Sequence, residues 1–157
     1  MIDSAEIVNA LVTLLRAIPD LVEAMGGDAT KIYAYQDRYP QSISLETAKY
    51  QMPAPGIMVA WNGTAPGSFG GFEVWKHEIS LCVRAGDDSG DLTPSGYYRI
   101  FRLITKGVPT GHTEAMQYIE VHASCDPMDT PSMRRQTDGA GVDYFEISMM
   151  FTERGDD

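Results

Sequence analysis

Apolar residues recur at helical spacing near the start of the chain. Asp3 stands where a helix cap is expected, and Glu6 follows at the capping-box position. Pro19 ends this pattern and can open a short second helix, which Gly26 and Gly27 would terminate. An amphipathic N-terminal helix is therefore predicted, with an apolar stripe made of Ile7, Val8, Leu11, Leu14, Leu15 and Ile18.

The middle of the chain alternates between apolar and polar residues, as strands with one packed face do. Residues 31–35 form a predicted short strand, and residues 56–62 and 72–85 form a hairpin around a long glycine-rich tip at 63–71. On the return strand one face packs, and the other is solvated or contacts a partner. The first face carries Trp75, His77, Ile79, Leu81 and Val83, and the second carries Lys76, Glu78, Ser80, Cys82 and Arg84.

Between these strands, residues 36–55 show no period and contain three prolines. We expect a long excursion there, with one helical turn at 45–49. Excursions of this length in compact domains are usually functional or disordered.

The second half of the chain repeats the order of helix and strands. Thr93 is a good N-cap and Pro94 a favoured first residue for a helix that closes at Gly107. Strands are predicted at 116–124 and 142–153, and residues 152–157 are expected to fray. The final strand points Phe145, Ile147, Met149 and Phe151 inward, and Tyr144, Glu146, Ser148 and Thr152 outward.

This order predicts an α+β fold: a mainly antiparallel β-sheet with two α-helices packed on one face and long interface loops. With 157 residues and 43% hydrophobic content, the chain suits a single domain spanning 1–157.

Charge and cysteine content narrow the classes of function. A net charge of −10 argues against a nucleic-acid binder unless the charge is sharply segregated. Apolar runs stay well below the ~18 residues of a spanning helix, and the acidic N-terminus does not look like an export signal. Cys82 and Cys125 fit buried thiols better than a disulfide framework.

The candidate metal and phosphate sites are weak. His122 and Cys125 lie three residues apart, but His77 and Cys82 fall on opposite faces of their strand, so packed side chains are expected rather than zinc ligands. The acidic segment 87–91 lacks the ligand spacing of a calcium loop, although an incidental cation site there stays open. The glycine-rich segment 67–72 joins two strands and opens no helix, so it is no phosphate loop.

Catalytic patterns are equally sparse. The chain contains no G-x-S-x-G nucleophile elbow. His122 near Glu146 or Glu78 could perform acid–base chemistry, but polar pairs on a solvated face are favoured. We therefore expect no catalytic, cofactor-binding or metal-binding residues, and no enzyme.

Two adjacent arginines, Arg134 and Arg135, stand in a Gly/Pro-rich loop of this acidic chain. Guanidinium groups pair with carboxylates in a geometrically specific way. If identical subunits form a ring, these arginines could bridge to acidic residues of a neighbouring copy, namely Asp87, Asp88 and Asp91.

The whole chain resembles a known family in the order and texture of its elements. "EIVNALVTLLRAIPDL" is followed by "KIYAYQDRYPQS", then "APGIMVAW", a strand ending "ISLCVRA", the helix "GYYRIFRLI" and a closing "YFEISMMFTER". In this respect it is similar to the tail terminators and related head–tail joining proteins of long-tailed bacteriophages and prophages.

The resemblance implies a structural protein of the virion, made in the bacterial cytoplasm and located in the neck or tail. Such subunits form a ring, typically a hexamer, on the tail tube; the ring stops tube polymerisation and meets the head-closure or connector protein. DNA passes through the channel without specific binding, and no membrane is involved. The interface would use residues 39–55, 63–71 and 128–141, with Tyr39 and Phe69 among them.

Two alternatives remain open. The chain could be a head-closure or other neck protein of the virion. It could instead be a small cone-shaped domain that binds or isomerises a small molecule, in which case His77, Tyr144, His122 and Glu146 would form the site.

Overall fold

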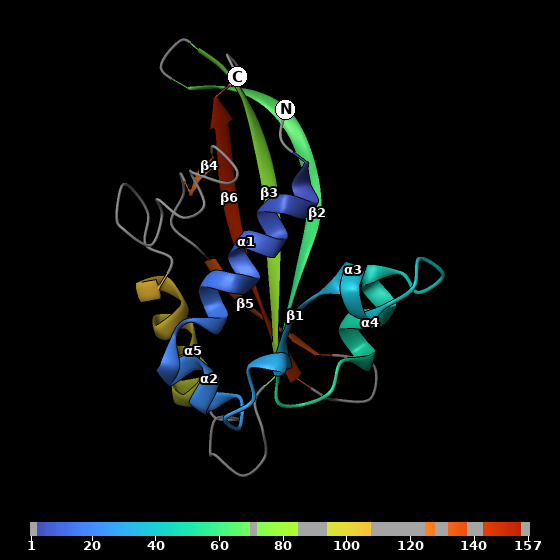
Figure 1. The fold of residues 1–157 in the computed structure, drawn as a ribbon, viewed down its shortest axis with the longest axis vertical. Coiled ribbons are helices and arrows are strands. Elements are labelled where there is room, and N and C mark those ends of the chain that lie inside the picture. Colours follow the sequence, from blue (N-terminus) through green and yellow to red (C-terminus); the bar gives the residue numbers. More distant parts are fainter. Residues whose placement is uncertain are drawn as a thin grey trace.

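The computed structural model describes residues 3–69, 72–84, 94–107, 125–127, 132–137 and 143–154. Its helices are α1 (Ser4–Arg16), α2 (Pro19–Ala24), the 3₁₀ turn η1 (Ala29–Lys31), α3 (Tyr35–Arg38), α4 (Leu45–Gln51) and α5 (Pro94–Gly107). Its strands are β1 (Ile32–Ala34), β2 (Gly56–Phe69), β3 (Phe72–Arg84), β4 (Cys125–Pro127), β5 (Ser132–Thr137) and β6 (Asp143–Arg154). The fold is α+β, as the sequence predicts (Figure 1).

The capping residues and helix breakers that the sequence predicts are found at the ends of α1 and α2. The Asp3 side chain accepts a hydrogen bond of 2.9 Å from the backbone N–H of Ala5, which satisfies one of the free donors at the helix start. Pro19 occupies the first turn of α2. Gly26 and Gly27 both follow α2 with a φ of 79°, a left-handed conformation that favours glycine.

The strands form one six-stranded sheet in the order β1-β2-β3-β6, with β4 and β5 both pairing with β6. The β2–β3 hairpin and the β3–β6 pair are antiparallel, with Ile57 opposite Val83 and Leu81 opposite Ile147. β1 is the exception, because it runs parallel to β2. α3 and α4 lie in the connection between them, as crossovers between parallel strands require.

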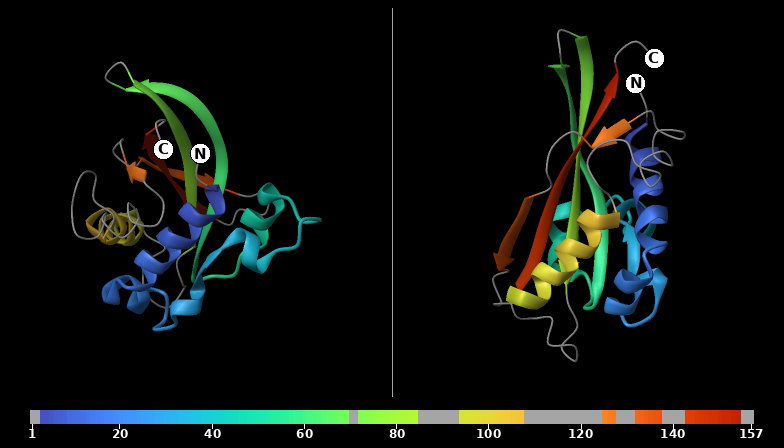
Figure 2. Two further views of the ribbon diagram at one scale, coloured as in Figure 1. Left: turned by 45° about the horizontal axis from the view of Figure 1, so that its top comes forward. Right: turned by 90° about the vertical axis from the view of Figure 1, so that its left-hand side faces the viewer.

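Helices cover both faces of this sheet. α1, α2 and α5 pack on the face formed by the inward residues of β2, β3 and β6, and the largest hydrophobic cluster lies between them. A smaller cluster on the opposite face brings Ala48 and Met52 against Tyr33, Met58 and Cys82. The prediction of two helices on one face is therefore right for α1 and α5 but incomplete, since α3 and α4 cover part of the other face (Figure 2).

Three element boundaries differ from the prediction. The helical turn expected at 45–49 is a helix, α4, that continues to Gln51. The segment from residue 63 to Phe69 belongs to β2 rather than to a hairpin tip, because its residues keep regular pairing with β3 up to Phe69 opposite Phe72. The predicted frayed end at 152–157 is wrong for residues 152–154, since β6 continues to Arg154 through its pairing with Val74.

The β2–β3 hairpin is the longest feature of the sheet. Figure 2 shows its distal part curving away beyond the helices, so that β2 and β3 form an arm at one end of the molecule. The strand expected at 116–124 lies outside the described residues.

Candidate interaction surface

The outer edge of β2 is the most conspicuous candidate surface. On that side β2 pairs with β1 only at Ile57, Met58 and Val59. Among the residues that the structure describes, no strand pairs with this side of β2 from Ala60 to Phe69. This stretch, called the free edge below, presents unpaired backbone N–H and C=O groups, which are a template for another strand.

The free edge lacks one of the usual features that block pairing of edge strands, a charged side chain. Its sequence "AWNGTAPGSF" contains no charged residue, whereas natural edge strands are often blocked by lysine. A bulge between Trp61 and Gly63 and the proline at Pro66 interrupt the edge locally. Trp61 on the same stretch is 47% exposed, so a partner that docks on the free edge could bury a large aromatic side chain.

A polar cluster fixes the root of the arm to the start of α1. The hydroxyl of Thr64 accepts a hydrogen bond of 2.9 Å from the Trp61 indole Nε1 and lies 2.9 Å from Nδ1 of His77. Ser4 Oγ lies 3.2 Å from the Thr64 hydroxyl. His77 is fully buried on the α1 side, so these contacts supply polar partners to a ring nitrogen that is shielded from water.

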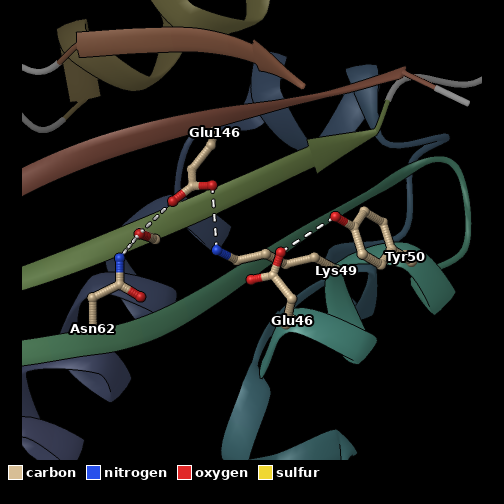
Figure 3. A network of polar contacts seen from close by, with 6 residues as sticks. Glu46, Lys49, Tyr50, Asn62 and Glu146 are labelled. Carbon is tan, nitrogen blue, oxygen red and sulfur yellow. Dashed lines mark hydrogen bonds and ion pairs between the residues drawn. The ribbon is translucent and has the colours of Figure 1, made fainter. Parts of the chain in front are cut away.

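A second polar network fixes α4 to the opposite face of the sheet (Figure 3). Lys49 Nζ lies 3.3 Å from Glu146 Oε2, and both side chains are largely buried. The other oxygen of Glu146 accepts a hydrogen bond of 3.1 Å from Ser80, whose hydroxyl accepts one from the Asn62 amide. The network therefore links one helix to three strands, and its charges are paired rather than isolated.

Arg84 and two tyrosines close the end of this network. The Arg84 guanidinium donates hydrogen bonds of 3.4 Å and 3.2 Å to the carbonyls of Lys49 and Tyr50 at the end of α4. Cations at this position complement the negative end of a helix dipole. Tyr50 and Tyr144 pack edge-to-face, with ring centroids 6.1 Å apart, and burial raises the pKa of Tyr144 to about 12.

Cys82 lies under α4 in the smaller hydrophobic cluster and is a free thiol. Burial raises its pKa to about 12, with nearby Lys49 opposing the shift and Glu146 adding to it. A thiol with so high a pKa is protonated at neutral pH and is a poor nucleophile or metal ligand.

The two arginines are not in a loop, which corrects the sequence prediction. Arg134 and Arg135 belong to β5, where they pair with Glu146 and Phe145 of β6. Their proposed partners Asp87, Asp88 and Asp91 lie outside the described residues.

The other predicted interface residues lie far apart. Tyr39 is half-buried, stacks on Tyr35 with ring centroids 6.0 Å apart, and packs against the smaller cluster. It therefore contributes to the fold as well as to the surface. Phe69 is the last residue of β2, at the far end of the arm.

Two of the four residues of the alternative small-molecule site, His77 and Glu146, are kept apart by the sheet. His77 lies on the α1 face of the sheet, whereas Glu146 lies on the α4 face, where it meets Lys49. Their strand positions are also separated, since His77 pairs with Phe151 and Cys82 pairs with Glu146. His122 lies outside the residues that the structure describes.

The part of the chain that the structure describes shows neither a metal centre nor a membrane-spanning helix. Within it, no group of three or more His, Cys, Asp or Glu side chains is placed to hold a metal ion. None of the helices in the described ranges is long and apolar enough to cross a membrane.

Sequence comparisons identify no relative of this chain. No protein-family model matches it, and no curated protein matches it significantly.

The sequence did not identify the residues that hold the arm and α4. Asn62 and Thr64 form an N-x-T sequon that predicts none of these contacts, Ser4 carries no motif, and Lys49 looks like one more polar residue in an irregular segment. The only signal was indirect: Ser80 and Glu146 occupy the predicted second face of the sheet, where two polar side chains can meet.

Proposed function

We propose that this chain is a non-catalytic structural subunit that assembles into a closed ring at the head-proximal end of a phage tail tube. There it would end tube polymerisation and join the tail to the head connector. The observation that carries this proposal is the free edge of β2, on an arm that extends beyond the helices.

Strand addition at an exposed edge is a common mode of protein association, because main-chain hydrogen bonds supply affinity. An unguarded edge in a monomer invites open-ended aggregation. A ring made of identical copies avoids this outcome, since each free edge is covered by a neighbour and the last contact closes the assembly. The lack of charge along the free edge fits such covering.

Ring closure needs two different surfaces on each copy. The sheet supplies them at its two sides. β2 presents the free edge on one side, and β4 and β5 lie beside β6 on the other. The acidic composition also fits a channel for DNA, because a net charge of −10 repels phosphates rather than trapping them.

Molar mass by light scattering, measured during gel filtration over a range of protein concentrations, tests the assembly. The wild type should give a discrete species near six subunits, which appears as a ring by electron microscopy. Added to polymerising tube protein from the same source, it should bind the tube ends and shorten the tubes. A ring that leaves the tubes unchanged would favour a head-closure or other neck subunit instead.

A shortened arm provides the matched variant. Residues 67–74 are replaced by Asn-Gly, a two-residue hairpin turn, which keeps the Pro66–Trp75 pair and the cluster around Thr64. This variant should fold and assemble only at higher concentrations than the wild type, because it lacks the distal part of the free edge, residues 67–69. Rings that form equally well from the shortened variant would rule out residues 67–74, the distal part of the arm, as part of the interface.

A further inference from the structure

The helix α5 is basic within an acidic chain. Its sequence contains three basic residues and no acidic one: Arg99, Arg102 and Lys106. The whole chain has 12 basic and 22 acidic residues, so the chain outside this helix contains nine basic and all 22 acidic residues. A basic helix in so acidic a chain is a local inversion of charge.

The basic residues lie on the exposed side of the helix. Ile100 and Ile104 are buried in the main hydrophobic cluster and fix which side of α5 faces the sheet. Arg99, Arg102 and Lys106 are exposed and follow one another at intervals of three and four residues, so they line one stripe. We call this stripe, together with Tyr98, the basic face.

An exposed tyrosine completes the basic face. Tyr98 is 52% exposed, and the Arg102 guanidinium lies 6.0 Å from the centre of its ring. Tyrosine and arginine are among the residue types enriched in the energetically important parts of protein interfaces. An exposed aromatic side chain does not improve solubility, so Tyr98 beside these cations indicates a contact surface.

The position of the basic face matters for assembly. Figure 1 shows α5 on the flank of the molecule away from β2, and both views of Figure 2 agree. The basic face and the free edge therefore lie on opposite flanks. The basic face can therefore contact a neighbouring copy without competing with the free edge. Because the free edge carries no charged residue, the acidic partner of the basic face lies elsewhere on that copy.

We propose that the basic face of α5 binds the acidic surface of a second copy of this chain. Charge complementarity selects this partner, because the rest of the chain is acidic and an identical neighbour offers that surface at high local concentration in a ring. Duplex DNA is a weaker candidate, since the net charge of the chain opposes association with phosphates. This inference rests on the proposed self-assembly and names the second surface that it uses.

The test compares two charge reversals that are matched in chemistry. Arg102→Glu removes a cation from the basic face. Arg38→Glu makes the same change on α3, where the exposed Arg38 also lies over a tyrosine ring, 4.4 Å from the centre of Tyr33. The control thus changes the net charge equally and removes the same kind of cation–ring contact, but on the other face of the sheet.

Light scattering at several concentrations gives the concentration of half-assembly for each protein. Arg102→Glu should raise this concentration about tenfold or more, as the loss of a charge pair across an interface does. Arg38→Glu should leave it within about twofold. In the wild type, raising the salt from about 50 mM to 500 mM should weaken assembly, because exposed charge pairs are screened. Circular dichroism checks that both variants are folded.

Three results would overturn the inference, and they separate it from the proposed function. Wild-type rings with unchanged assembly of Arg102→Glu would reject the basic face alone and leave the ring intact. A wild type that stays monomeric at every concentration would reject both. Binding of a fluorescent 30-base-pair duplex to the wild type that is lost in Arg102→Glu, with assembly unchanged, would assign the basic face to nucleic acid.

Discussion

At the scale of single residues, the main difference from the sequence prediction lies on the face of the sheet that α4 covers. The sequence pattern predicts that Cys82 and Glu146 point to a solvated or partner-binding surface, yet both lie under helices of the same chain. Cys82 is fully buried, so its ionised form would lose its hydration. The thiol is therefore a pH-sensitive reporter of the packed state.

Stability should fall at alkaline pH, in part because of Cys82. Its folded pKa is about 12, against an ordinary value of 9.0, so the unfolded chain releases its thiol proton first. The contribution is fully present below pH 9.0 and is lost as the pH rises toward 12. The free energy of unfolding, measured with urea at pH 8, 9 and 10, should decline more steeply for the wild type than for Cys82→Ala.

Taking the difference between the two proteins removes the titration of lysines and tyrosines that both contain. Cys82→Ala also leaves a small cavity, which lowers stability by a similar amount at every pH. Parallel declines for the two proteins would contradict the assigned burial of the thiol.

At the scale of elements, α4 depends on its tertiary contacts. A helix of seven residues is too short to be stable alone in water. Ser44 caps it, with its hydroxyl 3.2 Å from the backbone N–H of Thr47. The ion pair of Lys49 with Glu146 and the hydrogen bonds from Arg84 then hold its C-terminal half to the sheet.

Removing one partner of this ion pair should loosen α4. Glu146→Ala leaves the Lys49 ammonium without its carboxylate in a largely buried position, and should lower the free energy of unfolding by about 2 kcal/mol. Replacing both partners, as Lys49→Met with Glu146→Leu, should lower it by less. Urea unfolding of the set of variants measures these values.

Amide hydrogen exchange locates the effect in the structure. Exchange should accelerate in α4 of Glu146→Ala, while the amides of α1 stay protected. Equal losses of stability in Glu146→Ala and in the double variant would mean that the ion pair does not hold the helix.

At the scale of the whole molecule, the sheet ties the arm to the helices. β3 pairs with both β2 and β6 along most of its length. The main hydrophobic cluster joins α1, α2 and α5 to the same strands. One continuous core of this kind predicts one cooperative unit, as the sequence analysis expects for a single domain.

Two spectroscopic probes test this cooperativity. The chain has only two tryptophans, Trp61 on β2 and Trp75 on β3, so their fluorescence reports on the arm. Far-ultraviolet circular dichroism reports mainly on the helices. In a single domain the two urea transitions should coincide. The shortened-arm variant keeps both tryptophans and serves as the control for any separate unfolding of the end of the hairpin.

A fluorescence transition at clearly lower urea would show that the arm melts separately. That result would contradict the single-domain assignment, although the free edge would remain available for assembly.

By itself, the sequence determined the elements whose signals are local. The cap at Asp3, the proline at Pro19 and the glycines after α2 fix the helix ends through bonds within a few residues. The alternation along β3 and β6 fixed which side chains face the main core, because a strand's period of two leaves only two choices. These features predicted the α+β fold and its main antiparallel hairpin.

Only the tertiary structure decided the features that depend on distant partners. The strand β5 holds Arg134 and Arg135 because β6 offers it an edge, whereas its Gly/Pro-rich surroundings suggest a loop. Lys49 and Glu146 are 97 residues apart, so no local sequence pattern predicts their pairing. The free edge of β2 is likewise a property of the whole sheet. Whether a strand has a neighbour depends on topology, which residue patterns along one strand do not encode.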